Sequence, residues 1–164
     1  MARKKTTAER GLFKEQISKA LFKSKDIRDL MFDGEDVNGL KPQQLAVKFK
    51  EHVKSHLFID DTIQEAKTFI FYDVVFPRIE PNIKICKVIM YLVCHRSDLD
   101  NYTKEGYYGN RADILTQMVE DALINDEEVA NSFGIGRLTL ESIDPYNSSR
   151  FYGCVLTFDV PNFR

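Results

Sequence analysis

The chain has 164 residues, of which 43% are hydrophobic and 29% are charged, and its formal net charge is −2. This composition is typical of a single globular domain with a substantial core, and it excludes a disordered or fibrous protein. The near-neutral charge gives no bulk electrostatic attraction to nucleic acid or to an anionic membrane.

The cysteines and the hydropathy of the chain further narrow the class of protein. The three cysteines, Cys86, Cys94 and Cys154, form no CxxC pair, which argues against a zinc site or a disulfide framework. We therefore expect buried thiols in a reducing compartment. The basic N-terminus lacks the apolar segment of a secretory signal, and no run of 18 apolar residues predicts a membrane span.

The first 56 residues are predicted to be helical after a flexible basic tail at residues 1–6. Thr6 and Glu9 form a capping box that begins a helix reaching about Lys23, and Ser24 can cap a second, short helix. Pro42 suits the first turn of a third helix, which we expect to end near Ser55. Between the second and third helices, Asp33-Gly34 and Asn38-Gly39 predict turns.

The longest apolar run, residues 82–95, predicts a central β-strand. Isoleucines, a tyrosine and a valine occupy one parity of the run, while Cys86, Val88, Met90 and Leu92 occupy the other. Because alternate side chains of a strand point to opposite faces, both faces of this strand are apolar and both need cover. The helices of this chain supply cover for one face only, which favours a subunit over a self-contained domain.

The remaining elements complete an α+β fold. A strand over residues 66–75 precedes the central strand, and a loop at 76–81 joins the two in an antiparallel pair. After a long polar and aromatic loop at 96–109, Asn110 caps a clear amphipathic helix. Two strands at 135–143 and 150–160 follow, joined by a loop at 144–149. We predict a single domain, 1–164, in which a helical part (7–56) joins an α+β core (57–164): an antiparallel or mixed sheet of about four strands packed by a central helix.

No catalytic, metal or cofactor signature emerges. His52 and His56 have helical i, i+4 spacing, but the intervening Val-Lys-Ser lacks the glutamate of an HExxH site. Gly134-Ile135-Gly136 precedes a strand, which is the wrong context for a dinucleotide fingerprint. His95 with Asp98 or Asp100 is the one arrangement that could serve a small enzyme. We expect a non-enzymatic protein without cofactors.

Nucleic-acid binding is also weakly indicated. Lysines and Arg28 follow the basic tail along the first helices, but Glu9, Glu15, Asp26 and Asp29 alternate with them. That alternation is typical of a solvated helix face.

Aromatic residues in connections favour assembly instead. Seven aromatic side chains lie in predicted loops or at the terminus: Phe58, Phe76, Tyr102, Tyr107, Tyr108, Tyr146 and Phe163. Rigid aromatic rings supply contact area in protein interfaces, although any one of them can instead fold back over the core.

Short motifs in the second part of the chain resemble those of a known protein group. They are the Thr-Phe-Ile-Phe strand at 68–71, Arg96-Ser97-Asp98, the helix start at 108–113 (Tyr-Gly-Asn-Arg-Ala-Asp) and Phe-Gly-Ile-Gly at 133–136. Over about residues 57–164 the chain resembles the neck proteins of tailed bacteriophages, the head–tail joining and tail-terminator group. The N-terminal helices are less covered by this resemblance.

The resemblance implies a virion structural protein, assembled in the host cytoplasm into a ring that is usually hexameric. Such a ring contacts the neighbouring neck and tail-tube proteins and permits DNA to pass without specific binding. We expect the subunit and partner interface to include His95, Arg96, Asp98, Tyr102, Tyr107, Tyr108, Arg111, Tyr146 and Phe163. The alternatives are another neck ring, an adaptor or a stopper, and a monomeric binding module that acts through loop 96–109.

Overall fold

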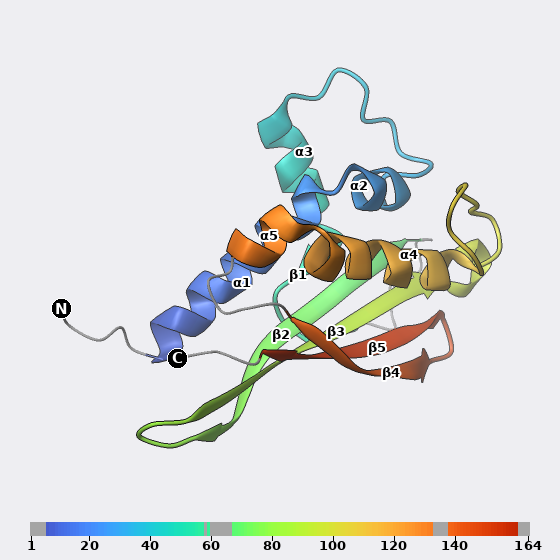
Figure 1. Ribbon diagram of the computed structural model, residues 1–164. Helices are drawn as coiled ribbons and strands as arrows, with labels where there is room; N and C mark the ends of the chain where they lie inside the picture. The colour runs from blue at the N-terminus through green and yellow to red at the C-terminus, as the bar shows by residue number, and fades with distance from the viewer. Residues whose placement is uncertain (1–5, 58, 60–66, 133–137, 161–164) are drawn as a thin grey trace.

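The protein folds as an α+β domain, as predicted, around one sheet of five strands, where about four were expected. The structure, a computed structural model, describes residues 6–57, 59, 67–132 and 138–160 (Figure 1). The sheet order is β1-β2-β3-β5-β4, with β1 parallel to β2 and the other neighbours antiparallel. The strands are β1 (Val53–Lys54), β2 (Thr68–Ile79), β3 (Lys84–His95), β4 (Thr139–Asn147) and β5 (Phe151–Val160).

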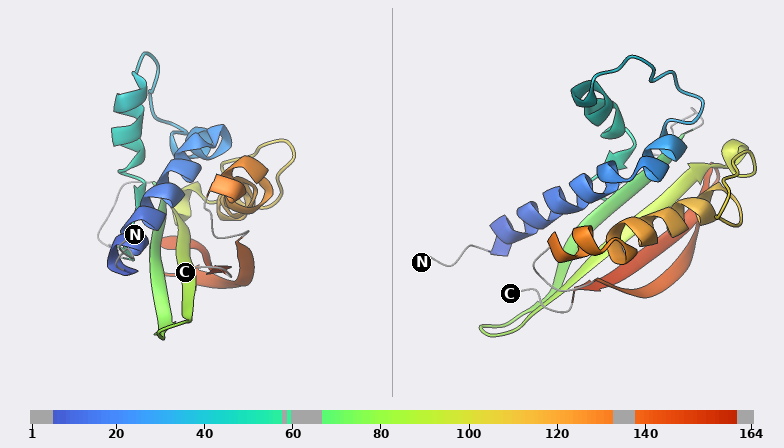
Figure 2. Two further views of the ribbon diagram at one scale, coloured as in Figure 1. Left: turned by 60° about the vertical axis from the view of Figure 1, so that its left-hand side comes forward. Right: turned by 45° about the horizontal axis from the view of Figure 1, so that its top comes forward.

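The helices lie on one face of this sheet. They are α1 (Thr6–Lys23), α2 (Lys25–Met31), α3 (Pro42–Phe49), α4 (Arg111–Glu120) and α5 (Glu127–Ser132), with the short turns η1 (Arg96–Asp98) and η2 (Asp121–Asn125). Helix α1 runs along the sheet between α3 on one side and α4 with α5 on the other (Figure 2). Two predicted caps are present: Ser24 accepts from the amide of Ile27, and Asn110 forms a capping box with Asp113.

Strand β3 is the central strand of the sheet, as the apolar residues on both of its faces predicted. It pairs with β2 along its length and with β5 from Cys86 to His95. On the helix side its residues are fully buried against α1, α2 and α4 in the main core. Residues 7–56 contribute to that same core through α1 and α2, so the helical part and the sheet form one packed unit.

The opposite face of the sheet, which we call the outer face, is only partly covered. At one end Phe69, Phe71, Val93 and Phe151 form a small buried cluster, against which Tyr91 and Tyr146 pack. Further along β3, Ile85 and Ile89 are half-exposed. Among the described residues no helix lies over this face (Figures 1 and 2).

Side chains of α1 close the edge of β2 beyond its short pairing with β1. Arg10 Nε donates to the carbonyl of Val74 at 2.6 Å, and the Tyr72 hydroxyl donates to the Lys14 carbonyl at 2.7 Å. Arg10 and Lys14 also pair with Asp73. Arg10 therefore covers part of the β2 edge that β1 leaves unpaired.

Three predicted boundaries were wrong. The third helix ends at Phe49 rather than near Ser55, because the chain turns there to pair β1 with β2. Strand β2 continues to Ile79 through a bulge that accommodates Pro77, so the expected loop at 76–81 shrinks to a tight turn. Strand β4 continues through Pro145 to Asn147, on an edge where proline costs no ladder hydrogen bond.

Two predictions from the sequence concern residues outside the described part of the chain. The basic tail up to Lys5 and the glycines at 134 and 136 lie outside the described residues. Within the described part of the chain, no helix combines the length and apolarity that crossing a membrane requires.

Candidate interaction surface

Loop 96–109 leaves the end of β3 and is held against the β4–β5 turn. Arg96 Nε donates to the carbonyl of Ser148 at 2.9 Å, its guanidinium also bonds Asn147, and its amide donates to Arg150. These contacts tie the first residues of the loop to the far hairpin of the sheet. The loop is therefore attached to the rigid scaffold at its beginning.

His95 closes β3 and faces the outer side of the sheet. Its ring lies edge-on to Phe151, with 5.7 Å between centroids, and its Nδ1 is 2.8 Å from the Ser97 hydroxyl. The Asp98 carboxylate instead accepts from the Asn101 amide at 2.9 Å. The structure thus shows His95 oriented by Ser97 and not by the aspartates that the enzyme hypothesis required.

Arg111 is the internal anchor of the loop. Its side chain is 5% exposed, and its guanidinium donates to the carbonyls of Asp98 (3.0 Å) and Leu30 (3.4 Å). It also donates to the side chains of Asp33 (2.7 Å) and Asn101 (2.9 Å). Although we expected Arg111 at the interface, its hydrogen-bonding groups are used inside the subunit, where they join α2, the loop and α4.

The guanidinium of Arg111 also organises the aromatic part of the loop. It lies 5.0 Å from the centroid of the Tyr102 ring, a cation–π distance. Burial raises the pKa of the Tyr102 hydroxyl above its ordinary value. Tyr102 therefore serves mainly as a half-buried lid over the arginine, with limited surface left for a partner.

The second half of the loop docks on α2 through Asp26. Lys104 Nζ lies 2.6 Å from Oδ1 of Asp26, and the Tyr107 hydroxyl donates to Oδ2 at 2.9 Å. The ammonium of Lys104 is the main cause that lowers the pKa of Asp26, while burial and the bond to Asp26 raise the pKa of Tyr107. The ion pair and the phenol together fix the loop to the helical layer.

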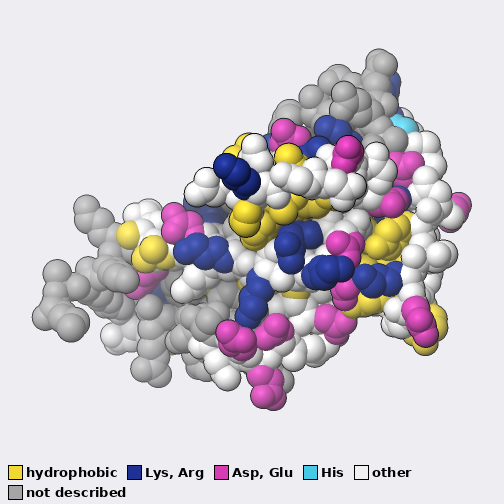
Figure 3. Space-filling model, turned by 90° about the horizontal axis from the view of Figure 1, so that it is seen from above, with side chains coloured by type: hydrophobic (Ala, Val, Ile, Leu, Met, Phe, Trp, Pro, Cys, Tyr) yellow, Lys and Arg dark blue, Asp and Glu magenta, His cyan; other side chains and the backbone are white. Residues whose placement is uncertain are grey.

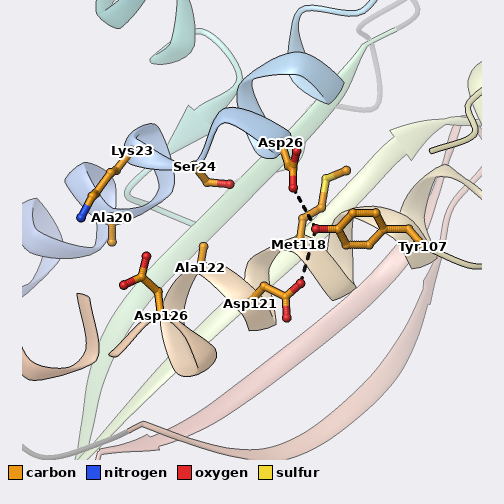
Figure 4. Close-up of a pocket in the computed structure, with 9 residues that line it drawn as sticks. All are labelled: Ala20, Lys23, Ser24, Asp26, Tyr107, Met118, Asp121, Ala122 and Asp126. Atoms are coloured by element: carbon orange, nitrogen blue, oxygen red, sulfur yellow. Dashed lines mark hydrogen bonds between the residues drawn. The ribbon is translucent and has the colours of Figure 1, made fainter. Parts of the chain in front are cut away.

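A small pocket lies beside this contact. It has a volume of about 200 Å³, and Figure 4 shows the Tyr107 hydroxyl between Asp26 and Asp121, with Met118 beside it. This volume is below the roughly 300 Å³ at which small-molecule sites begin. Within the described part of the chain, no three acidic, histidine or cysteine side chains converge as metal ligands.

Tyr108 is the aromatic residue of the loop whose side chain is exposed. Its side chain is 78% exposed, while its backbone is held on both sides by Gln117, which accepts from its amide (3.2 Å) and donates to its carbonyl (2.6 Å). Gly109 follows with φ +101°, where a Cβ would lie 2.5 Å from the Asp113 carboxylate. A rigid backbone that carries an exposed aromatic ring is well suited to bind a partner.

The remaining predicted interface residues are separated from this surface or not described. Tyr146 lies on the outer face, edge-on to Tyr91 with 5.7 Å between centroids. Phe163 and Phe58 lie outside the described residues. The predicted set therefore divides into an exposed part (Arg96 and Tyr108), a half-buried part (His95, Asp98, Tyr102, Tyr107 and Tyr146) and the buried Arg111.

The other candidates for chemistry are also separated in space. His52 is buried, with its ring nitrogens 2.8 Å from the Thr68 carbonyl and 3.0 Å from the Glu35 carboxylate, whereas His56 is exposed. The helix expected to carry both ends before either. Burial raises the pKa of the Cys86 and Cys94 thiols to about 12, so neither is poised to act as a thiolate.

Comparison with models of known protein families shows to which family the chain belongs. The model of the YomW family matches residues 15–160, from within α1 to the last residue of β5. The chain belongs to the YomW family. This is a family of phage-like proteins, so the coarser part of the sequence resemblance is confirmed. Comparison of this YomW-family chain with curated proteins and with solved structures gave no match.

Proposed function

We propose that this chain is a ring-forming structural subunit of a phage neck. In the virion it would act as a tail terminator or head–tail joining protein that links the tail tube to the head connector. The single observation that carries the proposal is the partly covered outer face of the sheet. Membership of a phage-like family supports a role in a phage.

The outer face carries half-exposed apolar side chains that a neighbouring subunit can bury, with Asp73, Lys87 and Asp159 on the same face. Val75 on β2, Ile85 and Ile89 on β3 and Val155 on β5 share this face by their pairing, and all four are half-exposed. A strand with two apolar faces gains little stability from the face that stays in water. A neighbouring subunit on the outer face would bury it.

The β2–β3 hairpin extends away from the body of the subunit. Strand β5 pairs with β3 only as far as Cys86, so the hairpin tip projects beyond it (Figure 1). At the tip Ile79 and Ile83 are 57% and 56% exposed. Lys84, paired with Glu9 at 2.9 Å, fixes the hairpin to α1. A stiff arm with apolar residues at its end can reach an adjacent subunit.

Loop 96–109, at the opposite end of β3, gives the ring a contact for its neighbours along the neck. The anchored backbone around Tyr108 would contact the next ring or the tail-tube protein. Head-to-tail contacts between copies close a ring when the rotation per subunit divides a full turn, and we propose a hexamer. With a net charge of −2, the subunits would let DNA pass through the lumen without tight binding.

Tyr108 also favours a second candidate function, a monomeric module that binds its partner through loop 96–109. Exposed aromatic residues held by a rigid backbone are enriched among the residues that dominate binding energy. The outer face distinguishes the two hypotheses, because a monomeric module leaves it in water. An adaptor or a stopper ring would share the outer-face contact and differ in its position along the neck.

A matched pair of substitutions tests the role of the outer face. Ile89→Lys places a charge at the centre of that face, and Ile143→Lys places one at an exposed position of β4 whose paired residue, Leu156, faces the helices. We expect the first variant to lose ring formation, measured by light scattering and by incorporation into particles, while Ile143→Lys retains both. A wild-type chain that is monomeric in solution and in particles would reject the ring, and intact assembly of Ile89→Lys would reject the outer face as the contact.

A further inference from the structure

A groove between α1 and the α3–β1 connection concentrates lysines. Its volume is about 720 Å³, and Tyr72 contributes to its lining from β2. The charged and titratable residues that line it are Lys14, Glu15, Lys19, Lys50, Lys54 and His56. The lysines outnumber the one glutamate, so the groove is positive although the chain as a whole is slightly negative.

Three of these four lysines lack a carboxylate partner within the subunit; the fourth, Lys14, lies 2.8 Å from Asp73. Lys23, Lys25, Lys48, Lys84, Lys87 and Lys104 all have one within the subunit. In the described part of the chain, the lysines with no such pair are Lys19, Lys41, Lys50 and Lys54, and all but Lys41 line the groove. Unpaired positive charge is therefore concentrated at one place.

The opposite flank of α1 carries the complementary charge. Residues 120–128 contain Glu120, Asp121, Asp126, Glu127 and Glu128 and no lysine or arginine. They span the end of α4, η2 and the start of α5, which pack against the other side of α1 from α3 (Figure 2). In the view from above, acidic side chains gather along the lower edge of the molecule, the side of these elements (Figure 3). Elsewhere on that face, positive and negative side chains alternate.

We propose that the lysine groove of one subunit receives the acidic 120–128 segment of the next copy. This inference rests on the proposed function, because it assigns a lateral contact of the ring. The two surfaces lie on opposite flanks of α1, so the contact is head-to-tail, the type that closes rings by rotation. Facing charges of opposite sign would steer association and fix the orientation of neighbours.

The alternative occupant of a lysine groove is a nucleic-acid backbone, and the charge distribution favours the protein partner. A DNA-binding groove would be expected to continue into a positive surface, whereas Glu15 lies within this one and Glu9 lies on the same helix. A subunit of this design also supplies its own acidic partner. DNA binding through the groove is therefore an outcome that overturns the proposal.

Charge reversal on each side tests the contact. Lys19→Glu with Lys50→Glu reverses two exposed groove positions, and Glu120→Lys with Glu128→Lys reverses two acidic ones. We expect each double variant to associate at least about tenfold more weakly than wild type in low salt, measured by sedimentation velocity. The control is Lys41→Glu, an exposed lysine without a carboxylate partner outside the groove, which should associate like wild type.

A charge swap separates a specific contact from a general effect of charge. A chain carrying all four reversals, or an equimolar mixture of the two double variants, should recover association. Circular dichroism confirms that each variant is folded. Recovery of association supports the proposed contact. If neither double reversal weakens ring formation, the contact is overturned but the proposed function is not. Wild-type chains that form no ring even in particles overturn the proposed function itself. The contact is also overturned if the charge reversals abolish binding of a DNA duplex to the chain while association between subunits is unchanged.

Discussion

Replacing Arg111 by alanine should destabilise the fold more than any surface substitution. The change leaves the carbonyls of Leu30 and Asp98 without their donor, and buried unsatisfied groups cost about 1–3 kcal/mol each. The cation–π contact with Tyr102 adds roughly 0.5–1 kcal/mol. Asp33 is 44% exposed and can be rehydrated, so the loss of that ion pair adds little. We expect a total of about 3–5 kcal/mol, the range typical of breaking a buried pair.

Thermal unfolding followed by circular dichroism measures this effect. For a chain of this length the expected loss lowers Tm by roughly 6–20 °C. Arg111→Lys keeps the charge but loses the planar fork, so it should fall between wild type and the alanine variant. Hydrogen exchange should rise at residues 99–107, because Arg111 joins loop 96–109 to α2.

A matched surface control defines the result that would refute this reasoning. Arg78→Ala removes an arginine whose ion pair with Glu80 is exposed, and such pairs are worth about 1 kcal/mol or less. If Arg111→Ala lowers Tm no more than Arg78→Ala does, the arginine is not the anchor of the loop. The same conclusion follows if hydrogen exchange in the loop is unchanged.

Three further substitutions probe the sheet, the docking of the loop and its tip. Gly153→Ala should cost about 3 kcal/mol or more in urea unfolding, since the added Cβ would lie 1.8 Å from the Leu92 carbonyl oxygen in the paired strand. Asp26→Asn should flatten the fall of Tm below pH 5: the pKa of Asp26 is lowered on folding, chiefly by Lys104, so its contribution is present above its ordinary value of 3.8 and lost as the pH falls through the folded value. Tyr108→Ser should leave unfolding within about 0.5 kcal/mol of wild type but reduce incorporation into particles.

Each of these has a control within the chain. Gly11→Ala adds a methyl group with no neighbour within 4 Å in an exposed helix position, so it should stabilise by about 0.5–1 kcal/mol. Asp100→Asn removes an exposed loop carboxylate and should leave the acid dependence of Tm as in wild type. Glu105→Ser tests whether any exposed substitution in the loop reduces incorporation. Controls that behave like the test variants would contradict the assigned roles.

Local signals in the sequence were sufficient to predict the helices that have their own capping residues and the strand that has its own apolar periodicity. Asn110 and Asp113 form the capping box of α4, Ser24 caps α2, and the two apolar parities of β3 identify the central strand. These features depend on residues within a few positions of one another. Consequently, the α+β class and the antiparallel β2–β3 pair could be predicted directly.

The errors arose where distant residues decide the structure. Val53 and Lys54 leave the predicted helix because they pair with Ile70 and Phe71, contacts that no local pattern encodes. Pro77 was interpreted as a loop residue, but a bulge places it within β2. Helix α5 was missed because acidic residues at 126–128 are equally typical of a solvated loop.

The exposure of the residues in loop 96–109 was predicted only in part. Loop 96–109 does present an exposed aromatic residue at Tyr108, yet the sequence could not show that Arg111 turns inward to Asp33 and Leu30. Its position directly after a capping asparagine, beside an aromatic loop, was the available signal. The lysine groove was missed because its residues come from two separate segments, and only the fold brings them together.

The position of this chain in an assembled phage particle tests the central proposal most directly. Cryo-electron microscopy of complete particles should show copies of the subunit as a closed ring between the tail tube and the head connector, with outer faces buried between neighbours. Particles that lack the chain at the neck, or that carry it as an isolated copy elsewhere, would contradict the account.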